Sequence, residues 1–124
     1  MARDLTVRLA ADRPGALAGV VQALSQSGVN IDGIAEVEGV VHVLARDPSA
    51  ARSALRTGGY TIEGELEVLI MPMPDRPGEL AMITRRLADA SVNVRFVYLA
   101  TETRVVIGVD DITAARQVLD ASKN

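Results

Sequence analysis

Hydrophobic and polar residues along the chain follow two periods, and both periods occur twice. The segment DLTVRLA alternates apolar and polar residues, which predicts a strand with one buried face, and LEVLIMPM later in the chain is predicted to be the matching strand. Apolar residues at helical spacing follow each of these segments. The residues that we expect to face the core are Leu5, Val7 and Leu9 in the first strand, and Leu66, Val68 and Ile70 in the second.

A longer stretch of sequence is repeated after each of these strands. DRPGALAGVVQALSQSGVNI begins at Asp12, and DRPGELAMITRRLADASVNV begins at Asp75. With one residue inserted, the match resumes where SAARSAL, from Ser49, aligns with TAARQVL, from Thr113. A repeat that runs through strand and helix patterns in the same order indicates two copies of one folding unit.

Each copy carries signals for the ends of its helices and strands. Pro14 and Pro77 suit the first turn of a helix, and Gly28 suits a left-handed helix end, where Ser91 stands in the second copy. Hairpin turns are predicted at residues 38–39 and 102–103. The second helix of each copy is predicted over about 48–57 and about 112–121. The order is β-α-β-β-α-β, which is the split βαβ arrangement of ferredoxin-like folds.

We therefore predict an α+β protein of two ferredoxin-like units in tandem, residues 1–65 and 66–124, each an antiparallel sheet with its helices on one face. The second unit is predicted to lack its own last strand, because only DASKN follows Leu119. In the first unit, YTI is followed almost at once by ELEVLIM, with Glu63-Gly64 as a tight turn. We hypothesise that one strand serves both units and joins their sheets.

The composition excludes several classes of function. The chain has 124 residues, a net charge of −3, and neither a basic face nor the aromatic platforms that single-stranded nucleic acid requires. It has no cysteine and a single histidine, His42, so a disulfide, a thiol nucleophile or a metal site is not expected. We find no signal peptide or membrane-spanning run, so we expect a cytoplasmic protein with no cofactor and no membrane or nucleic-acid partner.

The pattern D-R-P-G-x-L-A followed by V-N-I or V-N-V resembles the ACT domain, the small ligand-binding module of amino-acid-regulated enzymes. The resemblance covers both halves, so the chain looks like a stand-alone protein of two ACT repeats. It implies that a small amino acid binds between the loop that opens the first helix and the Asn at the start of the second strand. In ACT domains this usually happens at a junction between two such domains.

Elementary chemistry gives the residues of this implied site their roles. N–H groups at the helix start can hold a carboxylate, a glycine lets the ligand approach the backbone, Asp can pair with the ammonium, and Asn can donate and accept. If only one of the two sites binds ligand, we favour the first, whose helix–strand junction keeps Gly28 and Gly33. The candidate ligand-binding residues are Asp12, Arg13, Pro14, Gly15, Ala16, Leu17, Asn30 and Ile31 in the first copy, and Asp75, Gly78, Glu79, Leu80, Asn93 and Val94 in the second.

Purely structural roles also explain these patterns. Asp12 and Asp75 can cap the helices that follow them, and the two Asn residues can simply turn the chain between helix and strand. His42 alternates with core-facing valines, so we expect it on the sheet face away from the helices. Phe96 and Tyr98 replace smaller residues of the first copy, and they either line a pocket or fill space.

One sheet face of the second unit is predicted to be an interface. Leu69, Met71 and Val106 would lie on the face away from the helices, where exposed apolar residues are typical of an interface. We therefore expect a homo-oligomer, a dimer, that forms through this face. On this prediction, Leu69→Lys shifts the protein toward the monomer.

The leading functional prediction is a non-catalytic amino-acid sensor whose ligand state is read by a partner, either an enzyme of amino-acid metabolism or a regulator. The alternative is a structural or protein-interaction module that has lost its ligand. An enzyme is least expected, because the chain has no P-loop, no dinucleotide fingerprint and no thiol nucleophile.

Overall fold

The computed structural model describes residues 2–123, and contacts among them divide the chain into two compact units, Met1–Leu66 and Glu67–Asn124. The first unit contains β1 (Arg3–Arg8), α1 (Ala16–Gln26), β2 (Ile31–Val37), β3 (Val40–Ala45), α2 (Pro48–Thr57) and β4 (Ile62–Glu67), with β4 ending at the boundary. The second unit contains β5 (Leu69–Pro72), α3 (Glu79–Asp89), β6 (Val94–Ala100), β7 (Arg104–Val109) and α4 (Ile112–Lys123).

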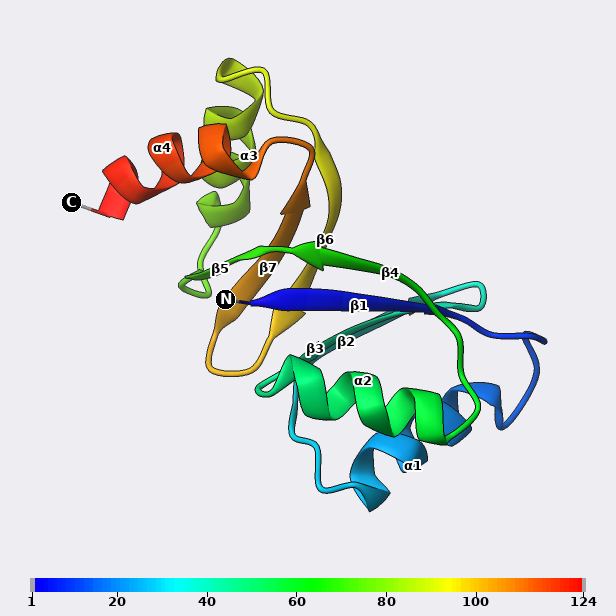
Figure 1. Ribbon diagram of the computed structural model, residues 1–124. Coiled ribbons are helices and arrows are strands. Elements are labelled where there is room, and N and C mark those ends of the chain that lie inside the picture. The colour runs from blue at the N-terminus through cyan, green and yellow to red at the C-terminus, as the bar shows by residue number, and fades with distance from the viewer. Residues whose placement is uncertain (1, 124) are drawn as a thin grey trace. The chain divides into compact units, whose positions relative to one another are not determined.

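The first unit has its elements in the order βαββαβ and consists of two helices on one sheet. Its strands lie in the order β4-β1-β3-β2, and β3 is antiparallel to both β1 and β2. Helices α1 and α2 lie together on one side of these strands (Figure 1). The core between the two layers contains Leu5 and Val7 from β1, Val20 from α1 and Leu55 from α2. The ferredoxin-like unit and its core-facing strand positions are therefore confirmed.

The second unit repeats this arrangement with three strands among the described residues. They lie in the order β6-β7-β5, with β7 antiparallel to both neighbours. Helices α3 and α4 pack against each other, and α4 continues to Lys123 (Figure 1). Residues 110–123 therefore contain no strand.

The DRPG segments form turns that precede the helices. The N–H of Ala16 donates to the carbonyl of Arg13 at 3.1 Å, and Gly15 has φ +91° and ψ −15°. These angles are those of the third residue of a type II turn, with Pro14 as the second. Gly78 has nearly the same angles, φ +94° and ψ −12°. Both helices begin after their glycines, so the prediction that the prolines occupy first helical turns is wrong.

The C-terminal ends of α1 and α3 close in the same way. The N–H of Val29 donates back to the carbonyl of Leu24 at 3.0 Å, and Gly28 between them has φ +71°. This is the Schellman arrangement, in which a left-handed residue ends the helix. The predicted left-handed end is confirmed, and at the end of α3 Ser91 adopts φ +60° without being a glycine.

The second unit buries the opposite face of its first strand from the one predicted. Leu69 and Met71 pack in the core with residues of α3 and α4, whereas Ile70 pairs with Val106 on the other face of the sheet. Val106 itself is fully buried. The predicted dimer interface through Leu69, Met71 and Val106 is therefore wrong, because none of the three is exposed.

A one-residue difference between the two loops accounts for this error. Leu9 and Met73 make equivalent backbone bonds to the hairpins of their own units. Two residues separate Leu9 from Asp12, but only Pro74 separates Met73 from Asp75. Because successive side chains of a strand point to opposite faces, a shift of one residue exchanges the faces.

The segment 62–72 supplies a strand to each unit. Gly64 lies inside β4, so the predicted tight turn at Glu63-Gly64 is wrong. The only interruption of the segment is at Val68, between β4, which lies beside β1, and β5, which pairs with β7.

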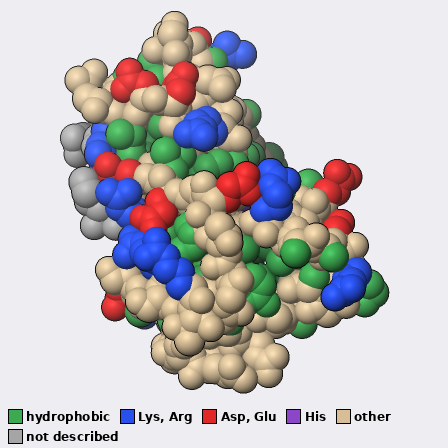
Figure 2. Space-filling model, turned by 45° about the vertical axis from the view of Figure 1, so that its right-hand side comes forward, with side chains coloured by type: hydrophobic (Ala, Val, Ile, Leu, Met, Phe, Trp, Pro, Cys, Tyr) green, Lys and Arg blue, Asp and Glu red, His purple; other side chains and the backbone are tan. Residues whose placement is uncertain are grey.

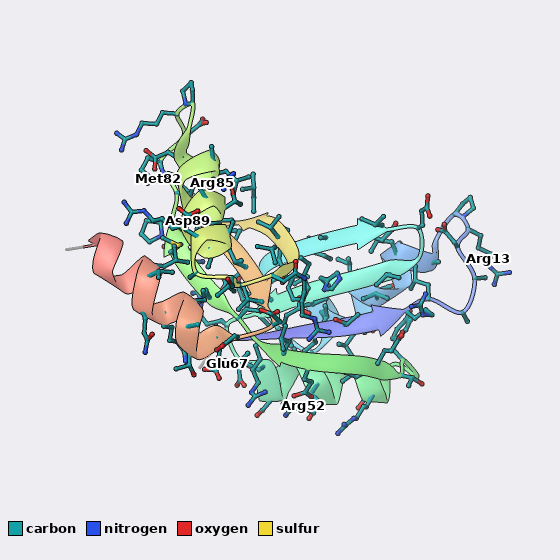
Figure 3. The ribbon with its side chains drawn as sticks, turned by 90° about the horizontal axis from the view of Figure 1, so that it is seen from above. Arg13, Arg52, Glu67, Met82, Arg85 and Asp89 are labelled. Carbon is teal, nitrogen blue, oxygen red and sulfur yellow. The ribbon has the colours of Figure 1, made fainter. Side chains whose placement is uncertain are left out.

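Two equivalent arginines bind carboxylates of this segment. Arg52 of α2 donates to both carboxylate oxygens of Glu65, at 2.5 and 2.9 Å. Arg116 of α4 occupies the matching position in the second copy and donates to Glu67 at 2.6 Å. Figure 3 labels Arg52 and Glu67, one from each pair. In each unit, the second helix thus forms an ion pair with a glutamate of its own unit, Glu65 in the first and Glu67 in the second.

Candidate functional site

Each DRPG loop begins beside the β-hairpin of its own unit. The N–H of Leu9 donates to the carbonyl of Gly39 at 2.8 Å, and the N–H of Met73 donates to the carbonyl of Thr103 at 2.9 Å. The Cβ of Asp12 lies 3.5 Å from the position that a Cβ on Gly39 would take. The candidate site residues of both loops therefore lie at the hairpin end of their sheets.

The first turns of α1 and α3 present N–H groups that the fold itself does not use. No side chain at the N-caps, Gly15 and Gly78, makes a capping hydrogen bond. In the part of the chain that the structure describes, no backbone carbonyl or side chain accepts from the N–H groups of Leu17 and Ala18. Unpaired N–H groups at the positive end of a helix dipole are suited to an anion. Asp12 is not the helix cap that the alternative interpretation expected.

Asn30 and Asn93 lie at the opposite end of their own sheets. In the first unit β3 begins at Val40, opposite the end of β1, and finishes at Ala45, opposite Ile31. In the second unit Val94 pairs with Val109, far along β7 from the hairpin. Within one unit the structure therefore does not bring the helix-start loop and the Asn together.

The side chain of Asn30 is committed to a polar cluster. Its amide nitrogen donates to Asp32 Oδ1 at 2.8 Å, and Arg46 donates to the same oxygen at 3.0 Å. Asp32 is buried, so these two bonds satisfy a carboxylate that solvent hardly reaches. At the equivalent place in the second unit, the backbone N–H of Asn93 donates to Asp110 at 3.0 Å. The side-chain contact gives Asn30 a structural role, whereas the bond of Asn93 is made by its backbone and does not require an asparagine.

The other predicted residues divide between the loops and the cores. Arg13 extends from its loop, as Figure 3 shows, and is exposed. Glu79 forms an ion pair with Arg76 of its own loop. Four of the predicted residues, Ala16, Leu17, Ile31 and Val94, pack against the cores of their units.

A cleft of about 380 Å³ adjoins the first loop. Its lining consists of Leu9, Ala10, Ala11, Arg13, Pro14, Gly15, Ala16 and Tyr60. Tyr60 was not among the predicted site residues, because it lies between α2 and β4, far from the loop in sequence. Its hydroxyl would be 2.4 Å from a Cβ on Gly19, so this glycine of α1 makes room for the tyrosine.

A second cleft, of about 270 Å³, adjoins the second loop. Its lining consists of Met73, Asp75, Leu99, Ala100, Thr103 and Arg104. Of these, only Asp75 was predicted from the sequence. Met73 directly follows β5, whereas the others belong to β6, the hairpin and β7, and no motif in the sequence marks them as neighbours of the loop. The position of the hairpin, which the sequence did predict, was the available signal.

A polar group of three side chains lies on the face of the first sheet away from the helices. Thr6 donates to Asp4 Oδ1 at 2.9 Å, and His42 Nδ1 lies 3.0 Å from the same oxygen. Asp4 is buried. The predicted orientation of His42 is confirmed. No group of residues suited to a metal ion occurs in the described part of the chain.

Several solved structures share this fold along nearly the whole chain. Protein BT0572 of Bacteroides thetaiotaomicron is 26% identical and has a TM-score of 0.82, with 98% of this chain and 88% of that chain covered. The regulatory subunit of aspartate kinase from Thermus thermophilus, in its ligand-free form, has a TM-score of 0.66 at 19% identity, over 97% and 90% of the two chains. The chain folds as two tandem ACT domains.

Relatives of known sequence match half of the ACT pair. The aspartokinase of Corynebacterium efficiens is 42% identical over 60 residues, which are 48% of this chain and 14% of that protein. The aspartokinase of Corynebacterium glutamicum is 40% identical over 60 residues. The match therefore covers only about 14% of the length of these aspartokinases. No family model matches the sequence.

The surface of the ACT pair mixes charge with apolar area. Acidic and basic side chains are interspersed over the face that Figure 2 shows, with apolar side chains between them. Among the residues that the structure describes, no helix has the length and apolar character needed to span a membrane.

Proposed function

We propose that this tandem ACT protein is a non-catalytic regulatory protein of the cytoplasm that binds a small amino acid at its DRPG loops. The observation that carries this proposal is the unused pair of N–H groups at each helix start, with a cleft beside the start of α1, in a fold shared with regulatory subunits of aspartate kinase. The ligand carboxylate would be held by these N–H groups, for example those of Leu17 and Ala18. Asp12 or Asp75 would pair with the ammonium.

The placement of the Asn residues limits how such a site can be completed. Asn30 lies at the far end of the sheet from the loop of its own unit. A ligand held by one loop can therefore contact an Asn only if that Asn belongs to another ACT unit. The proposal includes such a junction, which agrees with where ACT ligands usually bind.

Regulation follows if the ligand binds one arrangement of the ACT units more tightly than another. The ligand can shift this equilibrium only by its difference in affinity for the two states. We propose that a partner enzyme of amino-acid metabolism, or a regulator, responds to that shift. Self-association is part of the proposal, although not through the core residues Leu69 and Met71.

One observation favours a second candidate, a protein-interaction module without a ligand. The amide of Asn30 already donates to Asp32, so ligand contact is not needed to explain why Asn stands there. In this candidate the ACT pair retains the fold of a sensor and binds only a protein partner.

Thermal unfolding of the protein with each standard amino acid at millimolar concentration tests the proposal. Binding to the folded state alone adds about 2.7 kcal/mol at a hundredfold excess over Kd. Ala18→Glu and Ala81→Glu place a carboxylate beside the helix-start N–H groups at exposed positions, where it suits the helix dipole and competes with the ligand. Ala18→Gln and Ala81→Gln are the matched neutral controls.

We expect at least one amino acid to raise the unfolding temperature of the parent protein and of the Gln variants. One Glu variant should lose this response, and its identity tells which loop binds. If none of the amino acids raises the unfolding temperature, amino-acid binding is wrong and the interaction module is favoured.

A further inference from the structure

The lining of the cleft beside the second loop includes two residues of opposite charge. Asp75 supplies a carboxylate from the loop, and Arg104 supplies a guanidinium from the first position of β7. We propose that this cleft binds a free α-amino acid with an aliphatic side chain. The inference rests on the proposed function, in which Asp75 pairs with the ligand ammonium. It differs from that function because Arg104, rather than the helix-start N–H groups, binds the ligand carboxylate.

Arg104 is held in place with donors to spare. Its Nε donates to the carbonyl of Thr101 at 2.9 Å, and one Nη donates to the hydroxyl of Thr101 at 3.1 Å. A guanidinium has five N–H donors, so three remain for a ligand. A planar guanidinium that is already fixed by the hairpin can bind a carboxylate with two hydrogen bonds and little further loss of freedom.

The rest of the lining is suited to an apolar side chain. Leu99 pairs with Val105 on the core-facing side of the sheet, yet it is 65% exposed. Met73 and Ala100 continue this apolar lining. Covering exposed apolar area is favourable in proportion to the area removed from water, so an aliphatic chain fits this part of the cleft.

The hairpin holds an unfavourable backbone conformation at the cleft. Thr103 lines the cleft with φ +53°, and Glu102 before it has φ +61°. A β-branched residue rarely adopts positive φ, and such strained residues cluster at ligand sites. The hydroxyl of Thr103 can both donate and accept a hydrogen bond, so it adds an uncharged polar group to the lining.

The first unit provides an internal comparison at equivalent positions. Glu36 stands where Leu99 does, Val40 where Arg104 does, and Gly39 where Thr103 does. Glu36 accepts from the N–H of Gly39 at 3.1 Å, and Asp12 packs beside the same glycine. Two carboxylates lie at this hairpin, and Val40 replaces the arginine, so the position of Arg104 supplies no cation for a ligand carboxylate in the first unit. The sequence alone favoured the first unit, whereas the charges favour the second.

Isothermal titration of the full chain with L-leucine, L-isoleucine and L-valine tests this inference. Leu99→Glu and Arg104→Val replace two residues of the second unit with their equivalents in the first unit. The first unit already carries these residues at the same positions of the fold, so we expect both variants to fold. We expect each to weaken binding by about tenfold or more. Arg95→Gln, at an exposed arginine of β6 outside the cleft, is the control and should bind like the parent.

The same titration can compare leucine with analogues that lack one of its two charged groups. Isopentylamine lacks the carboxylate of leucine, and 4-methylpentanoate lacks its ammonium. Each should bind about tenfold or more weakly than leucine if both charges are recognised. Backbone amide NMR shifts on adding leucine to the parent protein should concentrate at residues 73–75 and 99–104, a result that does not depend on any variant.

The outcomes separate this inference from the proposed function. If leucine binds Leu99→Glu and Arg104→Val as tightly as the parent, or if the amide shifts lie elsewhere, the cleft is not the site although the protein still binds amino acids. If only charged or polar amino acids bind, the aliphatic class is wrong. If no amino acid binds at all, the inference and the proposed function both fail.

Discussion

Phe96 on β6 lies directly over Gly108, its register partner on β7. A Cβ on Gly108 would be 2.4 Å from Cζ of the Phe96 ring, far inside van der Waals contact. The ring also stacks on Tyr98, with centroids 6.0 Å apart and planes 22° from parallel. The first unit has the reverse arrangement, with Gly33 on β2 opposite Leu44 on β3. Each unit thus places one large residue and one glycine at this cross-strand position.

Gly108→Ala should destabilise the protein by about 1–3 kcal/mol, because an added methyl group in a packed site forces its neighbours to move. The ring of Phe96 cannot easily swing away while it stacks on Tyr98. Urea unfolding of the variant measures the loss. In a Phe96→Ala background the same substitution should cost less than half as much. Equal costs in the two backgrounds would show that the ring is not the obstacle.

The two helix ends offer a reciprocal exchange. Gly28 and Ser91 both have positive φ, at which a residue with a Cβ costs about 1 kcal/mol relative to glycine. Ser91→Gly should therefore raise the free energy of unfolding by about that amount, and Gly28→Ser should lower it similarly. No atom lies within 4 Å of a Cβ on Gly28, so the cost there is one of backbone conformation alone. Unfolding free energies that do not change in opposite directions would contradict this account.

The sequence predicted local structure well where patterns were redundant. The hairpin turns, the second helices and the left-handed helix ends were each marked twice, once in each copy. It failed at the first strand of the second unit, because VLIM is continuously apolar and contains no polar residue to fix which face is buried. The aligned copies then supplied the wrong register, since the loop after Met73 is one residue shorter.

The site could be predicted only in part for a different reason. The DRPG loops are local features, and their residues lie together as expected. Arg104 and Leu99 approach Asp75 only because the hairpin end of the sheet meets the loop, which is a long-range consequence of strand order. An Asn follows each DRPG loop at the same distance in sequence. Asn30 nevertheless lies at the other end of its sheet, because a helix and a change of chain direction separate it from its loop.

The corrected register gives Leu69 a role in stability. Leu69→Ala removes a buried side chain from the core of the second unit, and such truncations cost about 2–5 kcal/mol. Val37→Ala, at a side chain that is 69% exposed, should change stability by less than about 0.5 kcal/mol. Urea unfolding of both variants, with sedimentation to follow mass, makes the comparison. A Leu69 variant that keeps its stability but halves its mass would support the interface that the structure contradicts.

The ion pair between Arg52 and Glu65 should make stability depend on pH in one direction. Hydrogen bonding from Arg52, with its charge, holds the pKa of the Glu65 carboxyl below its ordinary value, against a smaller opposing effect of desolvation. A carboxyl whose pKa is lower in the folded state stabilises the fold above its unfolded pKa, about 4.3 for Glu. That contribution is lost as pH falls through the lower, folded pKa.

Glu65→Gln should therefore be less stable than the parent at pH 7, and the difference should shrink as pH falls below about 4.3. Urea unfolding at a series of pH values from 7 downward measures it. Glu63→Gln is the matched control, because its ion pair with Arg8 has side chains that are 48% and 62% exposed and is screened by water. Its effect at pH 7 should be smaller. A Glu65 effect that stays constant across this pH range would mean that packing, rather than the charge of the carboxylate, links α2 to β4.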